Sequence, residues 1–225
     1  MLTHIESVLS PEQVADFRQR LAAADWVDGK VTAGEQSALA KHNLQVPQDA
    51  ALSRELGEIV LAALGRNPAF VSAALPLRVF PPLFNRYDPG MGFETHVDNA
   101  IRFAGAVRYR TDLSATLFLS APQDYDGGEL IIEDNYGEHA IKLAAGDMIL
   151  YPATSLHRVE QITRGSRWAS FFWVQSMVKS DEQRALLAGL DQSVQQLSAK
   201  VGQGDLEVVR LAGTYHNLLR MWTEV

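Results

Sequence analysis

The 225-residue chain contains no cysteine. Disulfide bonds, thiolate zinc sites, iron–sulfur clusters and thiol nucleophiles are therefore excluded together. Any metal bound by this chain must be held by histidine, aspartate, glutamate or backbone oxygen. The absence of cysteine also fits a reducing compartment, and we expect a cytoplasmic protein.

Long apolar runs and basic blocks are also missing. No stretch is long and apolar enough for a transmembrane helix, and the opening MLTHIESVLSPEQ lacks the basic and apolar segments of a signal peptide. Twenty basic and 27 acidic residues give a net charge of −7 and a pI near 5.3. This balance predicts neither a nucleic-acid partner nor a membrane partner.

The overall composition, with 47% hydrophobic and 21% charged residues, is that of an ordinary globular protein. The ends of the chain carry helical patterns. Ser10 and Gln13 form a capping box around Pro11, and apolar residues follow at helical spacing. The same spacing predicts further helices at residues 49–65, 181–200 and 206–222.

The middle of the chain consists of short β-rich runs separated by turn signals, which is typical of a β-barrel or sandwich. Strands are predicted at residues 78–87, 93–97, 113–119, 129–133, 138–142, 147–151 and 167–177. We therefore expect a helical support region at residues 1–77, a β-domain at residues 78–177 and a helical region at residues 178–225.

A histidine and an aspartate lie two residues apart at the end of one predicted strand. Residues i and i+2 of a strand point to the same face, so His96 and Asp98 would project together while Val97 points away. An imidazole nitrogen beside a carboxylate oxygen supplies two of the three ligands of non-haem iron(II) oxygenases. A His-x-Asp pair alone is common, and a surface strand with an ordinary histidine explains it more simply.

Two further residues, both far downstream of this pair, strengthen the metal hypothesis. His157 follows a turn and an apolar strand, so the intervening strands could return it to the His-x-Asp segment. Arg167 opens an aromatic and apolar strand that we expect to be central in a sheet. A cation at the entrance of a buried strand needs an anion, and a guanidinium group can hold a carboxylate through two hydrogen bonds. A dicarboxylate cosubstrate would provide that anion.

Together these motifs resemble the iron(II)/2-oxoglutarate-dependent dioxygenases with a prolyl 4-hydroxylase-like catalytic domain. Within them, the chain resembles the bacterial PKHD-type hydroxylases of the PiuC/YbiX group, which is associated with iron uptake. The segment at residues 28–34 and the helical tail are also similar to this narrower group. The features that carry the resemblance are Asn85-Arg86-Tyr87, His96-Val97-Asp98-Asn99, Tyr125-Asp126-Gly127-Gly128-Glu129-Leu130, Gly146-Asp147-Met148, His157-Arg158-Val159 and Arg167.

The resemblance implies a mainly β fold with flanking helices and a double-stranded β-helix, or jelly-roll, core. It implies a hydroxylase whose dioxygenase domain spans residues 78–177. The catalytic iron(II) ligands would be His96, Asp98 and His157. Arg167 would bind the distal carboxylate of 2-oxoglutarate, and Tyr87 would contact the cosubstrate or serve as a core tyrosine. Ascorbate is the reductant that the resemblance implies.

Three hypotheses remain open from the residues. The chain is an oxygenase, a non-catalytic sensor of iron or 2-oxoglutarate, or a cupin-like enzyme that uses zinc or manganese. Dioxygen and a small siderophore-like molecule are the expected substrates, with a protein side chain as the alternative. Arg102, Arg108 and Arg110 lie in an expected loop that would form the mouth of the site and attract an anion, or would only be solvated.

The helical tail carries an apolar stripe, which consists of Leu211, Leu218, Leu219 and Trp222. Such a stripe forms part of a core or buries against a second subunit. The stripe favours a homodimer among the possible assemblies.

Overall fold

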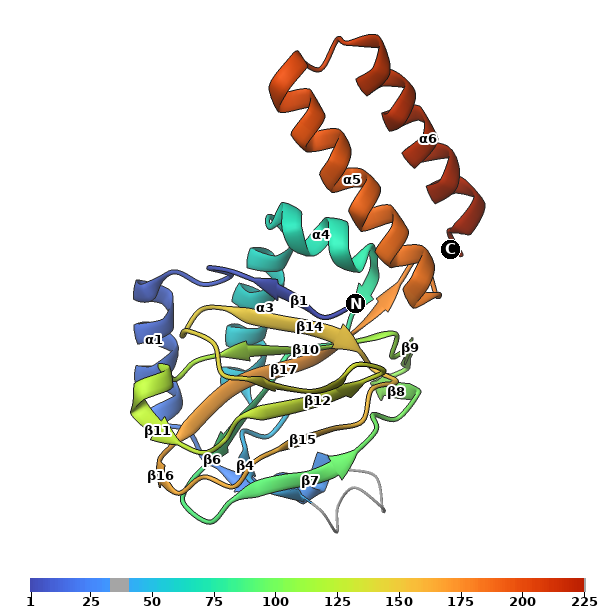
Figure 1. The fold of residues 1–225 in the computed structure, drawn as a ribbon. Coiled ribbons are helices and arrows are strands. Elements are labelled where there is room, and N and C mark those ends of the chain that lie inside the picture. Colours follow the sequence, from blue (N-terminus) through green and yellow to red (C-terminus); the bar gives the residue numbers. More distant parts are fainter. Residues whose placement is uncertain (33–40, 225) are drawn as a thin grey trace.

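The structure, a computed structural model, describes residues 1–32 and 41–224. The last part of the expected N-terminal motif, Ala33-Gly34, lies outside these residues. The two main sheets face each other and carry helices on one side and at the C-terminal end (Figure 1). The helices are α1 (Pro11–Ala22), η1 (Gly29–Thr32), α3 (Ala51–Gly65), α4 (Pro68–Ala74), η2 (Pro122–Asp124), α5 (Asp181–Val201) and α6 (Leu206–Trp222).

The larger sheet has eight strands in the order β1-β14-β10-β17-β6-β4-β2, with β5 beside β17. Its pairs are antiparallel, and its central strands are buried on both faces. Side chains on one face pack against α1, α3 and α4 in the main apolar core. The strands are β1 (Thr3–Ile5), β2 (Val27–Asp28), β4 (Leu44–Gln45), β5 (Pro76–Val79), β6 (Leu83–Tyr87), β10 (Leu113–Phe118), β14 (Met148–Pro152) and β17 (Arg167–Ser176).

The smaller sheet has five strands in the order β13-β12-β15-β7-β3. A second apolar cluster joins side chains of both sheets, including Tyr87 from the larger sheet and Ile132 from the smaller one, so the two sheets enclose a common interior. Two small two-stranded sheets, the hairpin β8–β9 and the distant pair β11–β16, complete the jelly roll. The remaining strands are β3 (Lys41–His42), β7 (Gly92–His96), β8 (Ile101–Ala104), β9 (Val107–Arg110), β11 (Tyr125–Asp126), β12 (Leu130–Asp134), β13 (Gly137–Ile141), β15 (His157–Val159) and β16 (Arg164–Gly165).

The mainly β fold with flanking helices is confirmed, and so are the capping box of α1 and the helices α3, α5 and α6. Other expectations were wrong. The described part of the first third also contains the short strands β1 to β4, and it contains α4, which was not predicted and which begins at Pro68 because Asn67 caps it. The expected strand at residues 78–87 is divided near Pro81 and Pro82, because proline has no N–H for a sheet ladder.

The segment after Asn99 was expected to be a loop, and it forms the hairpin β8–β9 instead. Cross-strand pairs such as Arg102↔Tyr109 join the two strands of this hairpin, which we call the β8–β9 arm. The predicted division of the chain at residues 78 and 178 stays a prediction.

The C-terminal hairpin of α5 and α6 projects away from the sheets (Figure 1). A small apolar cluster packs Leu218, Leu219 and Trp222 of the predicted stripe against Val178 and Leu187. Among the described residues, no helix has both the length and the apolar character needed to cross a lipid bilayer.

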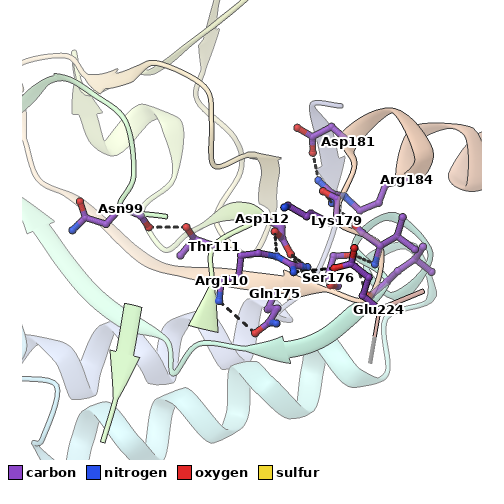
Figure 2. A network of polar contacts seen from close by, with 12 residues as sticks. Asn99, Arg110, Thr111, Asp112, Gln175, Ser176, Lys179, Asp181, Arg184 and Glu224 are labelled. Carbon is purple, nitrogen blue, oxygen red and sulfur yellow. Dashed lines mark hydrogen bonds and ion pairs between the residues drawn. The ribbon is translucent and has the colours of Figure 1, made fainter. Parts of the chain in front are cut away.

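Polar contacts fasten the base of this hairpin to the β-core. Figure 2 shows Arg110 at the centre, where its guanidinium group binds both carboxylate oxygens of Asp112 at 2.7 and 3.1 Å and reaches Glu224 at 3.2 Å. Asp112 also accepts a hydrogen bond from the backbone N–H of Ser176. Glu224, which follows α6, is thus bound through Arg110 to the β8–β9 arm.

Candidate functional site

Three potential metal ligands meet between β7 and β15. These strands are antiparallel neighbours in the smaller sheet, and their register places His96 opposite His157. The imidazole ring centroids are 4.2 Å apart, and Nε2 of His157 lies 3.7 Å from Oδ2 of Asp98. One ligand atom from each residue lies within 4.8 Å of the others. Strand periodicity predicted the proximity of His96 and Asp98, although β7 ends at His96 and Asp98 follows in the next loop.

Neighbouring oxygen atoms fix the orientation of each member of this cluster. Nδ1 of His96 lies 2.8 Å from the carbonyl oxygen of Glu94, and Nδ1 of His157 lies 3.0 Å from that of Ser155. Carbonyl oxygens only accept hydrogen bonds, so each Nδ1 is the protonated nitrogen and each Nε2 keeps its lone pair for a metal. The hydroxyl of Ser114 donates to Oδ2 of Asp98 at 2.6 Å. Sequence reasoning missed this serine.

His96 is kept in the form that binds metal. Burial, followed by the adjacent His157, lowers the pKa of His96 from 6.5 to about 4. A depressed pKa keeps the imidazole neutral at neutral pH, and only the neutral ring can coordinate a cation. Two imidazole nitrogens and one carboxylate, held together before any metal binds, suit iron(II).

A pocket extends from this cluster between the two sheets, and Arg167 forms one end of it. Arg167 begins β17 and is 1% exposed, with its guanidinium carbon 5.1 Å from the Phe118 ring centroid and 5.5 Å from that of Tyr87. Its Nε has no hydrogen-bond partner among the described residues. A buried guanidinium with an unsatisfied donor fits the carboxylate of a bound dicarboxylate.

Two buried tyrosines share this end of the pocket. Tyr87 pairs with Arg167 across β6 and β17, and Tyr151 packs edge-on against His157 with a centroid distance of 5.2 Å. Burial raises the pKa of both phenols, so their hydroxyls stay protonated and can donate hydrogen bonds. Tyr87 was expected to contact the cosubstrate or to serve as a core tyrosine; the structure places it beside Arg167, and its role stays a prediction. Tyr151 was missed, because a tyrosine in an apolar strand gives no signal of its direction.

The three arginines after the metal segment have different positions. Arg102 lines the pocket, Arg108 is exposed, and Arg110 is engaged with Asp112. Lys41, on β3, also lines the pocket although no motif marked it. Only the pairing of β3 with β7 brings this lysine to the site.

Two family descriptions match the chain. Residues 82–175 match the 2OG-Fe(II) oxygenase superfamily, and residues 181–224 match the PKHD-type hydroxylase C-terminal domain. A PKHD-type hydroxylase from Gluconobacter oxydans is 63% identical over 227 residues, and the PKHD-type hydroxylase PiuC from Pseudomonas aeruginosa is 57% identical over 227 residues. Both alignments cover 100% of each chain.

Solved structures share the fold at low sequence identity. A Pseudomonas putida prolyl-4-hydroxylase superimposes with a TM-score of 0.53 and 20% identity, over 77% of this chain and 92% of that one. A prolyl hydroxylase from Trichoplax adhaerens, solved with a hypoxia inducible factor peptide fragment, gives 0.58 and 15%, over 82% and 86%. Both similarities support the jelly-roll core.

These similarities agree with the resemblance drawn from the sequence motifs. Superfamily membership together with the His-Asp-His cluster supports iron(II) and 2-oxoglutarate as metal and cosubstrate. The protein is therefore an oxidoreductase of the dioxygenase class, and the chain belongs to the PKHD-type hydroxylases of the 2OG-Fe(II) oxygenase superfamily.

Proposed function

We propose that His96, Asp98 and His157 hold iron(II), and that the enzyme uses dioxygen and 2-oxoglutarate to hydroxylate a small molecule. The observation that carries this proposal is the convergence of three ligand atoms within 4.8 Å from two adjacent strands and a loop. The Nδ1 contacts of both histidines and the serine bond to Asp98 support it, because a metal site needs oriented ligands.

Each part of the pocket has a separate role in this proposal. Bound iron(II) supplies the coupling of dioxygen reduction to oxidative decarboxylation of 2-oxoglutarate. Arg167 binds the distal carboxylate of the cosubstrate, and the Tyr87 hydroxyl donates a hydrogen bond to it. The rings of Phe118 and Tyr87 lie against this guanidinium, and their apolar surface excludes water and strengthens the ionic contact.

The resemblance to the PiuC/YbiX group extends the proposal to the biological role. We infer a siderophore-like substrate, a link to iron uptake and iron homeostasis, ascorbate as the reductant and a cytoplasmic location. Exposed apolar side chains on the C-terminal hairpin, such as Leu206 and Met221, favour a homodimer formed through α5 and α6. Light scattering of the intact protein tests this assembly, and a monomer at all concentrations would contradict it.

The function is tested by adding iron(II) and then 2-oxoglutarate to metal-free protein without oxygen. We expect a visible charge-transfer band that needs both additions and that His157→Ala abolishes. His139→Ala is the matched control, since His139 lies on β13 bonded to Asp134 and outside the cluster. A band that survives in His157→Ala, or a folded and iron-loaded protein without any band, would contradict the proposal.

The band does not by itself distinguish an enzyme from a sensor. Admission of oxygen in the presence of candidate substrates must give succinate and a hydroxylated product in matching amounts. Tight iron and 2-oxoglutarate binding without any product would indicate the sensor, and activity that requires zinc or manganese would indicate the cupin-like alternative.

A further inference from the structure

The candidate ligand Asp98 lies in a short segment of irregular backbone between the end of β7 and the start of β8. Its neighbours Val97, Asn99 and Ala100 are exposed, so apolar packing contributes little to the order of this segment. A metal ligand nevertheless has to keep one direction before the ion arrives. Hydrogen bonds to the backbone around Asp98 are therefore the contacts that can fix it.

Two hydrogen bonds from Thr111, a residue between β9 and β10, hold this segment. The Thr111 hydroxyl donates to the carbonyl oxygen of Asn99 at 2.6 Å (Figure 2), and the Thr111 backbone N–H donates to that of Ala100 at 3.0 Å. Thr111 is only 6% exposed, so water competes poorly for its donors. Both bonds fix the backbone directly after Asp98.

The same stretch of chain also holds the Asp98 side chain. Ser114, which follows Thr111 and lies in β10, donates its hydroxyl to Oδ2 of Asp98 at 2.6 Å. Asp98 is therefore held by one stretch of chain in two ways, through its carboxylate and through the backbone that follows it. Both the position of its Cα atom and the direction of its carboxylate depend on this stretch.

Thr111 is itself anchored through its neighbour Asp112 (Figure 2). The side chain of Asp112 is 5% exposed, and its carboxylate accepts hydrogen bonds from Arg110 at 2.7 and 3.1 Å and from the backbone N–H of Ser176 at 2.8 Å. The backbone N–H of Asp112 donates to the carbonyl oxygen of Val174 at 3.1 Å. Ser176 and Val174 both belong to β17, so Thr111 is supported by a central strand of the larger sheet.

We propose that Thr111 is a positioning residue for the iron site, which acts by fixing the backbone after Asp98 and hence the direction of the Asp98 carboxylate. The hydroxyl performs this role, because it makes the shorter of the two bonds and reaches the residue next to Asp98. The inference rests on the proposed function, because it treats Asp98 as a ligand of iron(II).

Three variants separate positioning from a general contribution to stability. Thr111→Val removes the hydroxyl but keeps the backbone N–H that bonds to Ala100, and Thr111→Ser keeps the hydroxyl and is the rescue. Ser53→Ala is the matched control. Ser53 is 4% exposed and its hydroxyl also donates to a backbone carbonyl, that of Pro47 at 2.8 Å, but Ser53 lies on α3 and does not line the pocket.

The first measurement needs no metal. Hydrogen exchange of the backbone amide of residue 111, followed by NMR in metal-free protein and compared with the intrinsic rate, reports how often the bond to Ala100 opens. We expect exchange to be about fivefold faster in Thr111→Val, and close to the wild-type rate in Thr111→Ser and Ser53→Ala. An unaltered rate in Thr111→Val, or an equal acceleration in Ser53→Ala, would overturn the proposal.

The second measurement is the affinity for iron(II) alone, by equilibrium dialysis of the intact protein without oxygen. Thr111→Val should bind iron about tenfold more weakly than the wild type, because residues that orient a metal ligand contribute to metal affinity. Thr111→Ser and Ser53→Ala should bind it nearly as the wild type does. Wild-type iron affinity in Thr111→Val would overturn the proposal even if its amide exchanges faster, and so would an equal loss in Ser53→Ala.

His157→Ala in the same dialysis separates the two proposals. Iron binding that is lost in His157→Ala but unchanged in Thr111→Val would contradict only the positioning role. Iron binding that does not depend on His157 would contradict the proposed function, and the exchange rate of the residue 111 amide would still decide whether the Thr111 hydroxyl fixes this backbone.

Discussion

The two sheets of the jelly roll differ in how they are built and in what they carry. The central strands of the larger sheet are buried on both faces, whereas β7 and β13 of the smaller sheet are largely half-buried or exposed. Both candidate histidine ligands lie on the smaller sheet, while Arg167 and Ser114 lie on the larger one. The smaller sheet thus carries the two candidate histidine ligands, and the larger sheet carries the buried Arg167 and the serine that donates a hydrogen bond to Asp98.

This difference follows from what each group requires. A buried guanidinium loses hydration and must be surrounded by a rigid frame that keeps it in place until a carboxylate arrives. A metal ion adds its own binding free energy to the folded state, so its ligands can lie on strands with less apolar support. Substitutions in the two sheets should therefore have different effects on metal affinity, cosubstrate affinity and stability.

The largest expected effect comes from the smaller sheet. His157→Ala should reduce turnover to the level of metal-free protein, because two remaining ligands cannot retain the metal. Equilibrium dialysis of iron(II) together with a product assay measures both losses. His139→Ala, on the same sheet, should leave both unchanged, and full iron-dependent activity in His157→Ala would refute the ligand assignment.

The larger sheet should respond differently. Arg167→Met should raise the KM for 2-oxoglutarate by about 10- to 100-fold, because the distal carboxylate loses its charged partner. Iron affinity should be nearly unchanged. The free energy of unfolding without ligand should not fall much, since an apolar side chain replaces a buried cation. Steady-state kinetics and urea unfolding test the two parts, and an unaltered KM would remove Arg167 from the cosubstrate site.

Ser114 does not follow this division between the sheets, because it belongs to the larger sheet but contacts a candidate metal ligand. Ser114→Ala should weaken iron binding by about tenfold, because Asp98 loses the hydrogen bond that orients its carboxylate. Ser170→Ala on β17 is a matched control, as Ser170 is buried but does not line the pocket. Equal iron affinities in both variants would show that the bond to Asp98 has no role in metal binding.

The smallest expected effect is a pH dependence of the metal-free protein. The pKa of His96 is about 4 in the folded state and 6.5 ordinarily, so between these values the unfolded chain binds more protons. The free energy of unfolding should therefore fall as the pH drops from about 6.5 towards 4. Urea titrations at pH 7 and pH 5 measure this loss, and His96→Gln should reduce it. An identical pH dependence in His96→Gln would exclude His96 as its source.

Sequence patterns could predict the parts of this molecule that follow from local rules. Alternation along a strand placed His96 and Asp98 together, and capping residues located α1. Lys41 and Ser114 could not be predicted, because each is an ordinary residue in its own segment. Their positions depend on pairings between distant segments, β3 with β7 and β10 with β17.

Short elements could not be predicted for a related reason. The strands β1 to β4 contain two or three residues each, too few for alternation to be visible. The β8–β9 arm has charged and apolar residues in a spacing that also suits a solvated loop, and only its packing on Phe80 and Trp173 distinguishes the two. Tertiary contacts therefore bring Lys41 and Arg102 to the pocket, whereas local sequence indicated the His-Asp-His cluster.

The most direct test of the central claim is a crystal structure of the intact protein grown without oxygen in the presence of iron(II) and 2-oxoglutarate. We expect one iron ion bound to Nε2 of His96, a carboxylate oxygen of Asp98 and Nε2 of His157. The distal carboxylate of 2-oxoglutarate should lie against Arg167. Iron held by any other set of side chains, or 2-oxoglutarate bound away from Arg167, would contradict the assignment of this site.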